Sequence, residues 1–327
     1  MRGRFLVGRG VSQASFSRRG FFGAAGGAVG LLVVGGCTAG SAAPSASSPS
    51  VGRSSRPASS SPASATPSPT PSLKPLPAST VWRPAAADVT PAAKLRAVAT
   101  VEALTRWSPN ESGPRLGSGV AATSRIVDAQ YGGILSTSAS VLVVVDQWIR
   151  ATDGSVRATG TTVDVRLARR SNGWAVTAVL PAKPGGPSHA LSGLARSVLA
   201  NPRLHLPYAA RADIASGTIS VGVLSALQTL SRSHVLDVSV VKSGHPLLVF
   251  GTSRPSDHPR GHAVDVWAVD GRPLVNPANH GLASALMRAG IGAGAYQAGG
   301  PIDLDGGGHS YFSDNTHQDH VHLGFHG

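Results

Sequence analysis

The chain has 327 residues, a formal net charge of +13, and a composition that is 41% hydrophobic but only 5% aromatic. No basic run is interleaved with aromatic side chains, so the sequence argues against a nucleic-acid-binding protein. Cys37 is the single cysteine, which excludes an intramolecular disulfide. The length is sufficient for two domains of ordinary size behind a leader segment.

Residues 1–37 have the features of an export signal. The first 36 residues contain five arginines and no acid, and an apolar, glycine-rich stretch runs from 21 to 34. This stretch is too short and too rich in glycine to favour a membrane-spanning helix, and its basic front is typical of a secretory signal. The segment around Arg18 and Arg19 (Ser-Arg-Arg-Gly-Phe-Phe) resembles the twin-arginine export motif.

The end of the leader predicts a lipid anchor. Val34-Gly35-Gly36-Cys37 resembles a bacterial lipobox, in which the cysteine becomes the lipidated first residue of the mature protein. We therefore expect attachment to the outer face of the cytoplasmic membrane through lipid on Cys37. Residues 38–80 are almost wholly Ser, Pro, Ala, Thr and Gly, which predicts an extended, disordered tether that reaches into the cell wall.

Residues 91–183 are predicted to form a small α+β domain. Ala92–Thr105 has helical apolar spacing, and three strand-like runs follow, separated by the turns Asp153-Gly154 and 171–173. The strands are expected at 141–149, 161–167 and 174–180. A helix followed by an antiparallel meander resembles the nuclear-transport-factor-2-like, cystatin-type fold. The domain has no histidine, cysteine or paired acid, so it is interpreted as a spacer or docking module.

A Pro/Gly break at 184–187 separates a second α+β domain, at residues 188–327. Apolar spacing predicts helices at 191–199, 221–233 and 282–289. Short apolar runs predict extended segments at 235–241, 246–250, 263–269 and 321–325. Asp270-Gly271 is typical of a hairpin turn after the third of these runs.

The candidate chemistry lies in this second domain, because all 12 histidines fall between His189 and His326. Side chains alternate along a strand, so Asp265 and His322 should point away from the core at two neighbouring strands, with His258 on the preceding loop. His258, Asp265 and His322 could then hold Zn²⁺ with a fourth position open, and no thiolate competes for it. Asp319 would act as general base on the water, and His320 would assist the base or the developing oxyanion.

These residues resemble a known family. Ser256-x-His258-x-x-Gly261-x-Ala263-x-Asp265 followed by Asp319-His320-x-His322 resembles the zinc peptidases that cut D-amino-acid peptide bonds of peptidoglycan. This superfamily includes the D-Ala-D-Ala carboxypeptidases, the lysostaphin-type endopeptidases and the N-terminal Hedgehog domain, and the resemblance covers about residues 235–325. It implies His258, Asp265 and His322 as zinc ligands, Asp319 and His320 as catalytic residues, and peptidoglycan stem peptides or cross-links as the substrate.

The sequence departs from this family at one segment. The family has Ser-Gly-Tyr-Arg on an earlier strand, where the arginine binds the substrate carbonyl, whereas this chain has Ser243-Gly244-His245-Pro246. Arg254 and Arg260 are candidates to replace that arginine. Three functions therefore stay open: a wall peptidase, an inactive zinc-containing protein that binds peptidoglycan, and a structural lipoprotein that binds metal incidentally.

Overall fold

The computed structural model describes residues 73–327. The predictions for Arg18, Arg19, Cys37 and most of the linker lie outside the described residues. Residues 73–80 have no regular secondary structure. Within the described part of the chain, no helix is long and apolar enough to cross a membrane.

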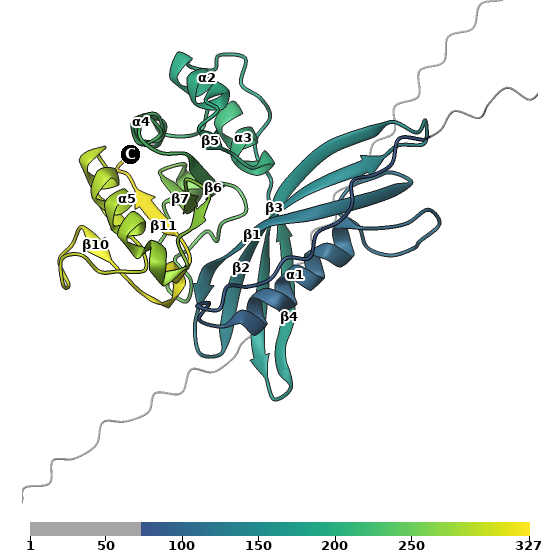
Figure 1. The fold of residues 1–327 in the computed structure, drawn as a ribbon, viewed down its shortest axis with the longest axis horizontal. Helices are drawn as coiled ribbons and strands as arrows, with labels where there is room; N and C mark the ends of the chain where they lie inside the picture. The colour runs from purple at the N-terminus through teal and green to yellow at the C-terminus, as the bar shows by residue number, and fades with distance from the viewer. Residues whose placement is uncertain (1–72) are drawn as a thin grey trace, which may run out of the picture. The chain divides into compact units, whose positions relative to one another are not determined.

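A four-stranded antiparallel sheet and one helix form the first part of the fold (Figure 1). The helix is α1 (Pro91–Thr105), and the strands, in sheet order, are β1 (Ala121–Ile134), β2 (Ser138–Arg150), β3 (Val156–Arg170) and β4 (Gly173–Pro181). The helix buries its small and branched residues, among them Ala97 and Val101, in one core with the β-branched run of β2. The predicted helix, three strands and two turns are confirmed. Strand β1 was not predicted, because charged and polar residues interrupt its apolar alternation.

Strand β1 is irregular. Its pairing with β2 shifts register twice, between Ile126 and Asp128 and between Tyr131 and Gly133. Such bulges interrupt the alternation of side chains and re-aim individual residues. The segment between the two shifts holds Gln130 and ends at Tyr131, and both residues are almost fully buried.

A seven-stranded mixed sheet with helices forms the second part. Its strand order is β10-β9-β11-β7-β6-β5, and β8 pairs with β7. The strands are β5 (Leu204–His205), β6 (Leu236–Val240), β7 (Ala263–Val269), β8 (Arg272–Pro273), β9 (Gln297–Gly299), β10 (Tyr311–Phe312) and β11 (Val321–Gly324). The helices are α2 (Gly193–Ala200), α3 (Tyr208–Ala215), α4 (Val221–Leu230) and α5 (His280–Gly292), and the 3₁₀ turns are η1 (His258–Arg260), η2 (Pro277–Asn279) and η3 (Asn315–Gln318).

One core joins the helices to this sheet. Leu227 of α4 and Met287 of α5 are fully buried against Val264, Val266 and Leu323 of the two central strands. Asp265, which lies between the two valines, and His322, which precedes Leu323, consequently face the opposite side of the sheet. The predicted alternation in β7 and β11 is thus confirmed, and with it the hairpin at 270–271.

One predicted strand was wrong, and one helix was missed. Residues 246–250 form an irregular loop rather than a strand, with one isolated bridge between Leu248 and Pro255. Pro246 lacks an amide donor for a ladder, and Gly251, with a φ of 77°, reverses the chain directly afterwards. Leu247 is consequently 74% exposed. Helix α3 was not predicted at all.

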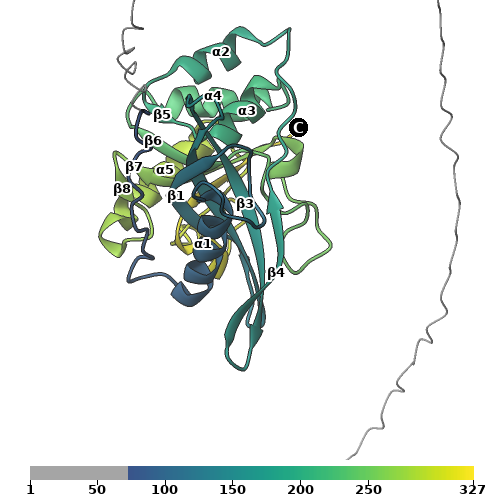
Figure 2. The ribbon, with the colours of Figure 1, turned by 90° about the vertical axis from the view of Figure 1, so that its right-hand side faces the viewer.

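The two sheets belong to one compact unit of the described chain. Strand β1 contacts η3, and α3 contacts β3. Figures 1 and 2 show β1 beside β6 and β7 from two directions. The described residues are mixed α+β, with two sheets and five α-helices.

Candidate metal centre

Three side chains converge at the centre of the second sheet. His258 Nε2 lies 3.1 Å from Asp265 Oδ1 and 3.1 Å from His322 Nδ1, and the last two atoms are 3.0 Å apart. Donors at about 2.0–2.1 Å around a tetrahedral zinc are separated by roughly 3.3 Å. The triangle therefore has nearly the size that a zinc ion requires.

Local structure explains why these three residues meet. Asp265 and His322 are register partners in the antiparallel pair β7–β11, so their side chains leave the same face of the sheet. His258 lies on η1, which ends at Gly261 in the left-handed region, with a φ of 75°. This turn feeds β7 and returns His258 over the strand, and its side chain is fully buried.

The proton inventory of the triangle favours a cation. His258 Nδ1 lies 2.9 Å from Val241 O, and because a carbonyl only accepts, Nδ1 carries the proton. In the neutral form, His258 would then present a lone pair at Nε2 to the carboxylate oxygen of Asp265, which is also an acceptor. A proton on His322 Nδ1 can satisfy only one of these two acceptors at a time. A metal ion would satisfy all three ligand atoms together.

The electrostatics of the ligands favour the same forms. Burial lowers the pKa of His322 to about 4, although Asp265 opposes this shift, so the imidazole is neutral at pH 7. Burial opposes ionisation of Asp265, but the imidazoles of His258 and His320 hold the pKa of its carboxyl well below the usual range. A neutral His322 beside an ionised Asp265 matches the forms of these two ligands that bind zinc.

His245 is a further imidazole that the sequence analysis did not count as a ligand. Its ring stacks on His258 at 4.1 Å between centroids, and its ligand atom lies within 4.8 Å of those of His258 and Asp265. Its Nδ1 donates to Pro246 O at 3.0 Å, which leaves Nε2 with a lone pair. Burial and the nearby His258 lower the pKa of His245 well below its usual value. The sequence did offer one indication of this histidine, because His245 lies in the segment 243–246, where the chain departs from the motif that it otherwise resembles.

Asp319 and His320 form a bonded pair beside the triangle. His320 Nδ1 donates to Asp319 Oδ1 at 2.7 Å, while His320 Nε2 faces Asp265 Oδ2 at 3.8 Å. Burial lowers the pKa of His320, but Asp265 and Asp319 outweigh it and raise that pKa to about 9. His320 lines the pocket described below, whereas Asp319 does not. Asp319 thus lies behind the histidine rather than at the open side of the site.

Residues of the first sheet and its helix reach this pair. Lys94 Nζ lies 2.7 Å from Asp319 Oδ2 and also pairs with Asp88. The backbone N–H of Tyr131 donates to the same Asp319 oxygen at 3.0 Å. Both oxygens of Asp319 are therefore engaged by protein donors. Residues 91–183 were interpreted as a spacer or docking module, but they supply side chains to the candidate site.

A second contact from β1 reaches a ligand directly. Gln130 Nε2 donates to Asp265 Oδ2 at 2.6 Å, and Gln130 Oε1 accepts from Ser239 Oγ. No motif in the sequence marks Lys94 or Gln130, since each is an isolated polar residue in a helix or strand. Their role is visible only after the two sheets are placed together.

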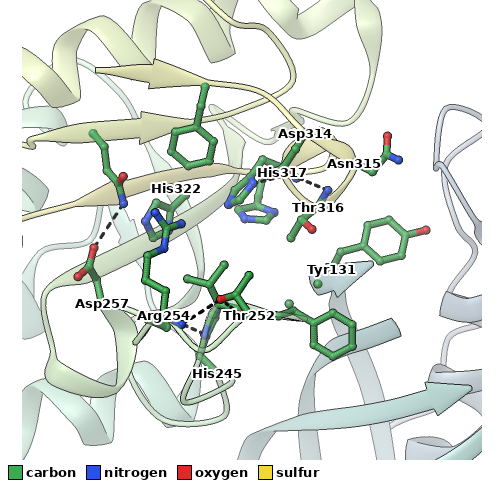
Figure 3. Close-up of a pocket in the computed structure, with 18 of the residues that line it drawn as sticks. Tyr131, His245, Thr252, Arg254, Asp257, Asp314, Asn315, Thr316, His317 and His322 are labelled. Carbon is green, nitrogen blue, oxygen red and sulfur yellow. Dashed lines mark hydrogen bonds and ion pairs between the residues drawn. The ribbon is translucent and has the colours of Figure 1, made fainter. Parts of the chain in front are cut away.

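A pocket of about 870 Å³ opens beside the centre (Figure 3). Its lining includes His245, His317, His320 and His322. His317, whose ring is held by Asp314 at 2.7 Å, stands 5.7 Å from the His322 ring. The remaining walls come from the end of β1, the loop 249–257, the segment 308–317 with β10, and the side chains of Arg260, Tyr296 and Gln297.

The two candidate arginines differ in their surroundings. Arg260 is paired with Asp257. Arg254 makes no ion pair among residues 73–327, and Figure 3 shows its side chain rising from the loop toward the His322 end of the pocket. Arg254 is thus the arginine whose charge is available to a ligand.

The comparisons with known proteins identify no relative. No protein-family model matches the chain, no curated protein matches it, and no solved structure matches it.

Proposed function

We propose that the protein is a zinc peptidase of the cell envelope that hydrolyses peptidoglycan stem peptides or cross-links. The observation that carries the proposal is the buried triangle of His258 Nε2, Asp265 Oδ1 and His322 Nδ1, whose spacing of 3.0–3.1 Å is close to that of the donors around a zinc ion. The open pocket beside it supports a catalytic rather than a purely structural metal. On this proposal the second part of the fold is Hedgehog/D-Ala-D-Ala-peptidase-like, and the first is nuclear-transport-factor-2-like.

His258, Asp265 and His322 would hold the ion. When bound, zinc supplies Lewis acidity, which activates water and polarises a scissile carbonyl at neutral pH. The residues of the chain supply orientation: Val241 O fixes the tautomer of His258, and Gln130 occupies the second oxygen of Asp265. Such outer contacts are typical of zinc ligands.

We assign proton transfer at the pocket to His320 Nε2. His320 lines the pocket, its Nε2 lies 3.8 Å from Asp265 Oδ2, and the hydrogen bond from Nδ1 to Asp319 Oδ1 fixes the ring orientation. Protonated His320 can donate to a developing oxyanion or to the leaving amine. Direct proton transfer by Asp319 stays a prediction, and the donors on both of its oxygens favour an orienting role instead.

Arg254 is the proposed group for substrate recognition. An unpaired guanidinium at a pocket wall suits a carboxylate or carbonyl of a peptide. Arg260 is less suited, because Asp257 already neutralises it.

A second function, wall binding without catalysis, is favoured by one observation. His245 lies in the segment where the peptidases that the motif resembles carry their substrate-binding arginine, one position before the arginine itself, and its ligand atom lies within 4.8 Å of those of His258 and Asp265. If His245 completes the coordination, the ion has no open position, and the site is structural.

The test uses the full chain, purified in detergent, loaded with zinc and incubated with purified peptidoglycan, with products followed by mass spectrometry. The proposal expects release of D-alanine or cleaved cross-links by the wild type. His320→Ala should lower the rate at least about 100-fold with zinc retained, in line with the usual contribution of a general acid or base. His205→Ala, a change at an exposed histidine on β5, is the matched control and should leave the rate unchanged. If the protein binds zinc stoichiometrically and binds the wall tightly but releases no product, the peptidase proposal is rejected in favour of wall binding without catalysis.

A further inference from the structure

The first sheet contributes a buried amide to the candidate metal centre. Gln130 has no exposed surface, and neither do Ser239 and Asp265. The three side chains form one chain of hydrogen bonds: Ser239 Oγ donates to Gln130 Oε1, and Gln130 Nε2 donates to Asp265 Oδ2 at 2.6 Å. Ser239 Oγ also lies 3.3 Å from the backbone oxygen of Asp265.

This arrangement divides the two oxygens of Asp265 between different partners. Oδ2 accepts from Gln130, and Oδ1 faces His258 and His322. Rotation of the carboxylate out of its plane would break the bond to Gln130 and leave a buried amide donor without a partner, which is unfavourable. Gln130 therefore fixes the orientation in which the carboxylate is offered to the ion.

The sheets could adhere without such contacts, because apolar residues would hold two buried faces together at no cost in desolvation. Instead, three buried donors from this side end on carboxylates of the site: Gln130 Nε2 on Asp265, and Lys94 Nζ and the Tyr131 backbone N–H on Asp319. The bulges that flank Gln130 in β1 re-aim its segment toward these carboxylates. Packing of the two sheets against each other does not by itself require that these donors end on carboxylates of the candidate site.

We infer that the first sheet completes the metal centre, with Gln130 as a positioning residue for the ligand Asp265. This inference rests on the proposed metal site but not on catalysis. It makes the C-terminal part dependent on residues 91–183 for tight metal binding, and it gives these residues a role beyond that of a spacer.

The experiment measures zinc affinity of the full-length protein by competition with a chromophoric chelator. Gln130→Met preserves the volume of the side chain and removes both hydrogen bonds. We expect zinc affinity to fall about 10–100-fold, as for other partners of zinc ligands. The visible absorption of the cobalt-loaded protein should change as well, because the carboxylate can rotate and alter the coordination geometry.

Gln147→Met is the matched control. Gln147 is a second buried glutamine of the same sheet, but its amide bonds with Thr105 O and Leu116 O, away from the centre. It should lower the free energy of unfolding to a similar extent and leave zinc affinity and the cobalt spectrum unchanged. Ser239→Ala, which removes the anchor of Gln130, should weaken zinc binding less than Gln130→Met.

The outcomes separate the inference from the proposed function. A folded Gln130→Met protein with wild-type zinc affinity and cobalt spectrum would overturn the inference and leave the metal site standing. Equal losses in Gln130→Met and Gln147→Met would show a general effect of weakened packing and would also overturn it. A wild-type protein that binds no zinc would overturn both.

Discussion

Lys94 Nζ lies 2.7 Å from Asp319 Oδ2, and the two side chains are only 3% and 4% exposed. The same ammonium pairs with Asp88, and both Asp319 and Asp88 raise the pKa of Lys94 against the effect of burial. One helix of the first part of the chain therefore supplies the charge that neutralises a carboxylate next to the candidate metal centre. Stability and function should both depend on this contact.

We expect Lys94→Met to lower the free energy of unfolding by about 3–5 kcal/mol, because removal of one partner leaves buried carboxylates without compensation. Urea denaturation at pH 7 measures this change. Lys94→Arg, which keeps the charge, should lose less. The control is Lys242→Met, since the Lys242 amine bonds with Thr218 at an exposed position, and its loss should stay within about 0.5 kcal/mol. Equal unfolding free energies of Lys94→Met and Lys242→Met would contradict the conclusion that Lys94 neutralises buried carboxylates.

Asp128 predicts a pH-dependent loss of stability. Burial raises its pKa to about 7 despite Lys94, and one carboxylate oxygen, Oδ2, has no hydrogen-bond partner. Between about pH 4 and pH 7 the unfolded chain has released this proton while the folded protein retains it, so stability falls as pH rises through that window. The full difference would be about 4 kcal/mol at 1.36 kcal/mol per pKa unit, and partial exposure should reduce it to about 1–3 kcal/mol.

The variant Asp128→Asn cannot ionise, and it should be more stable than the wild type at pH 8 but not at pH 4. Thermal or urea unfolding from pH 4 to pH 8 provides the measurement. Asp146→Asn, at the pair with the exposed Arg125, is the control and should retain the wild-type slope. An unchanged slope in Asp128→Asn would show that this carboxyl does not titrate in the window.

The roles of His245 and His322 can be separated by zinc titration. We expect His322→Ala to weaken zinc binding more than about 100-fold, since it removes one corner of the donor triangle. His245→Phe keeps the ring stacked on His258 and should reduce affinity less than about tenfold, because the catalytic proposal needs an open position. A loss in His245→Phe as large as that in His322→Ala would identify His245 as a fourth ligand.

Gly261 sets the turn that places His258, and its replacement should be costly. Its φ is 75°, and a Cβ atom there would lie 2.3 Å from Thr218 O. Gly261→Ala should therefore cost about 1–2 kcal/mol for the left-handed backbone and more for the clash, and it should weaken zinc binding by moving His258. Gly271→Ala is the control: its φ is 70°, but no heavy atom lies within 4 Å of the added Cβ. Equal unfolding free energies would exclude the clash.

Local patterns in the sequence were sufficient for much of the second part of the fold. Alternation of apolar residues predicted β7 and β11 and the faces of Asp265 and His322, because the two-residue period of a strand is a local property. The placement of His258 on the loop before β7 was likewise a local inference, and Gly261, with its left-handed backbone, ends the turn that carries it. The convergence of the three candidate ligands thus followed from residues close together in two short segments.

The tertiary structure decided what surrounds these ligands. Gln130 lies 135 positions before Asp265, and Tyr131 lies 188 positions before Asp319, so no local period connects them. Strand β1 escaped prediction because bulges and polar side chains disrupt its pattern, and these same features carry it to the site. Lys94 has the appearance of a surface lysine in the sequence of α1, and only the packing of the two sheets shows that it is buried against carboxylates. Contacts between distant segments depend on the sum of many packing interactions, which no short stretch of sequence encodes.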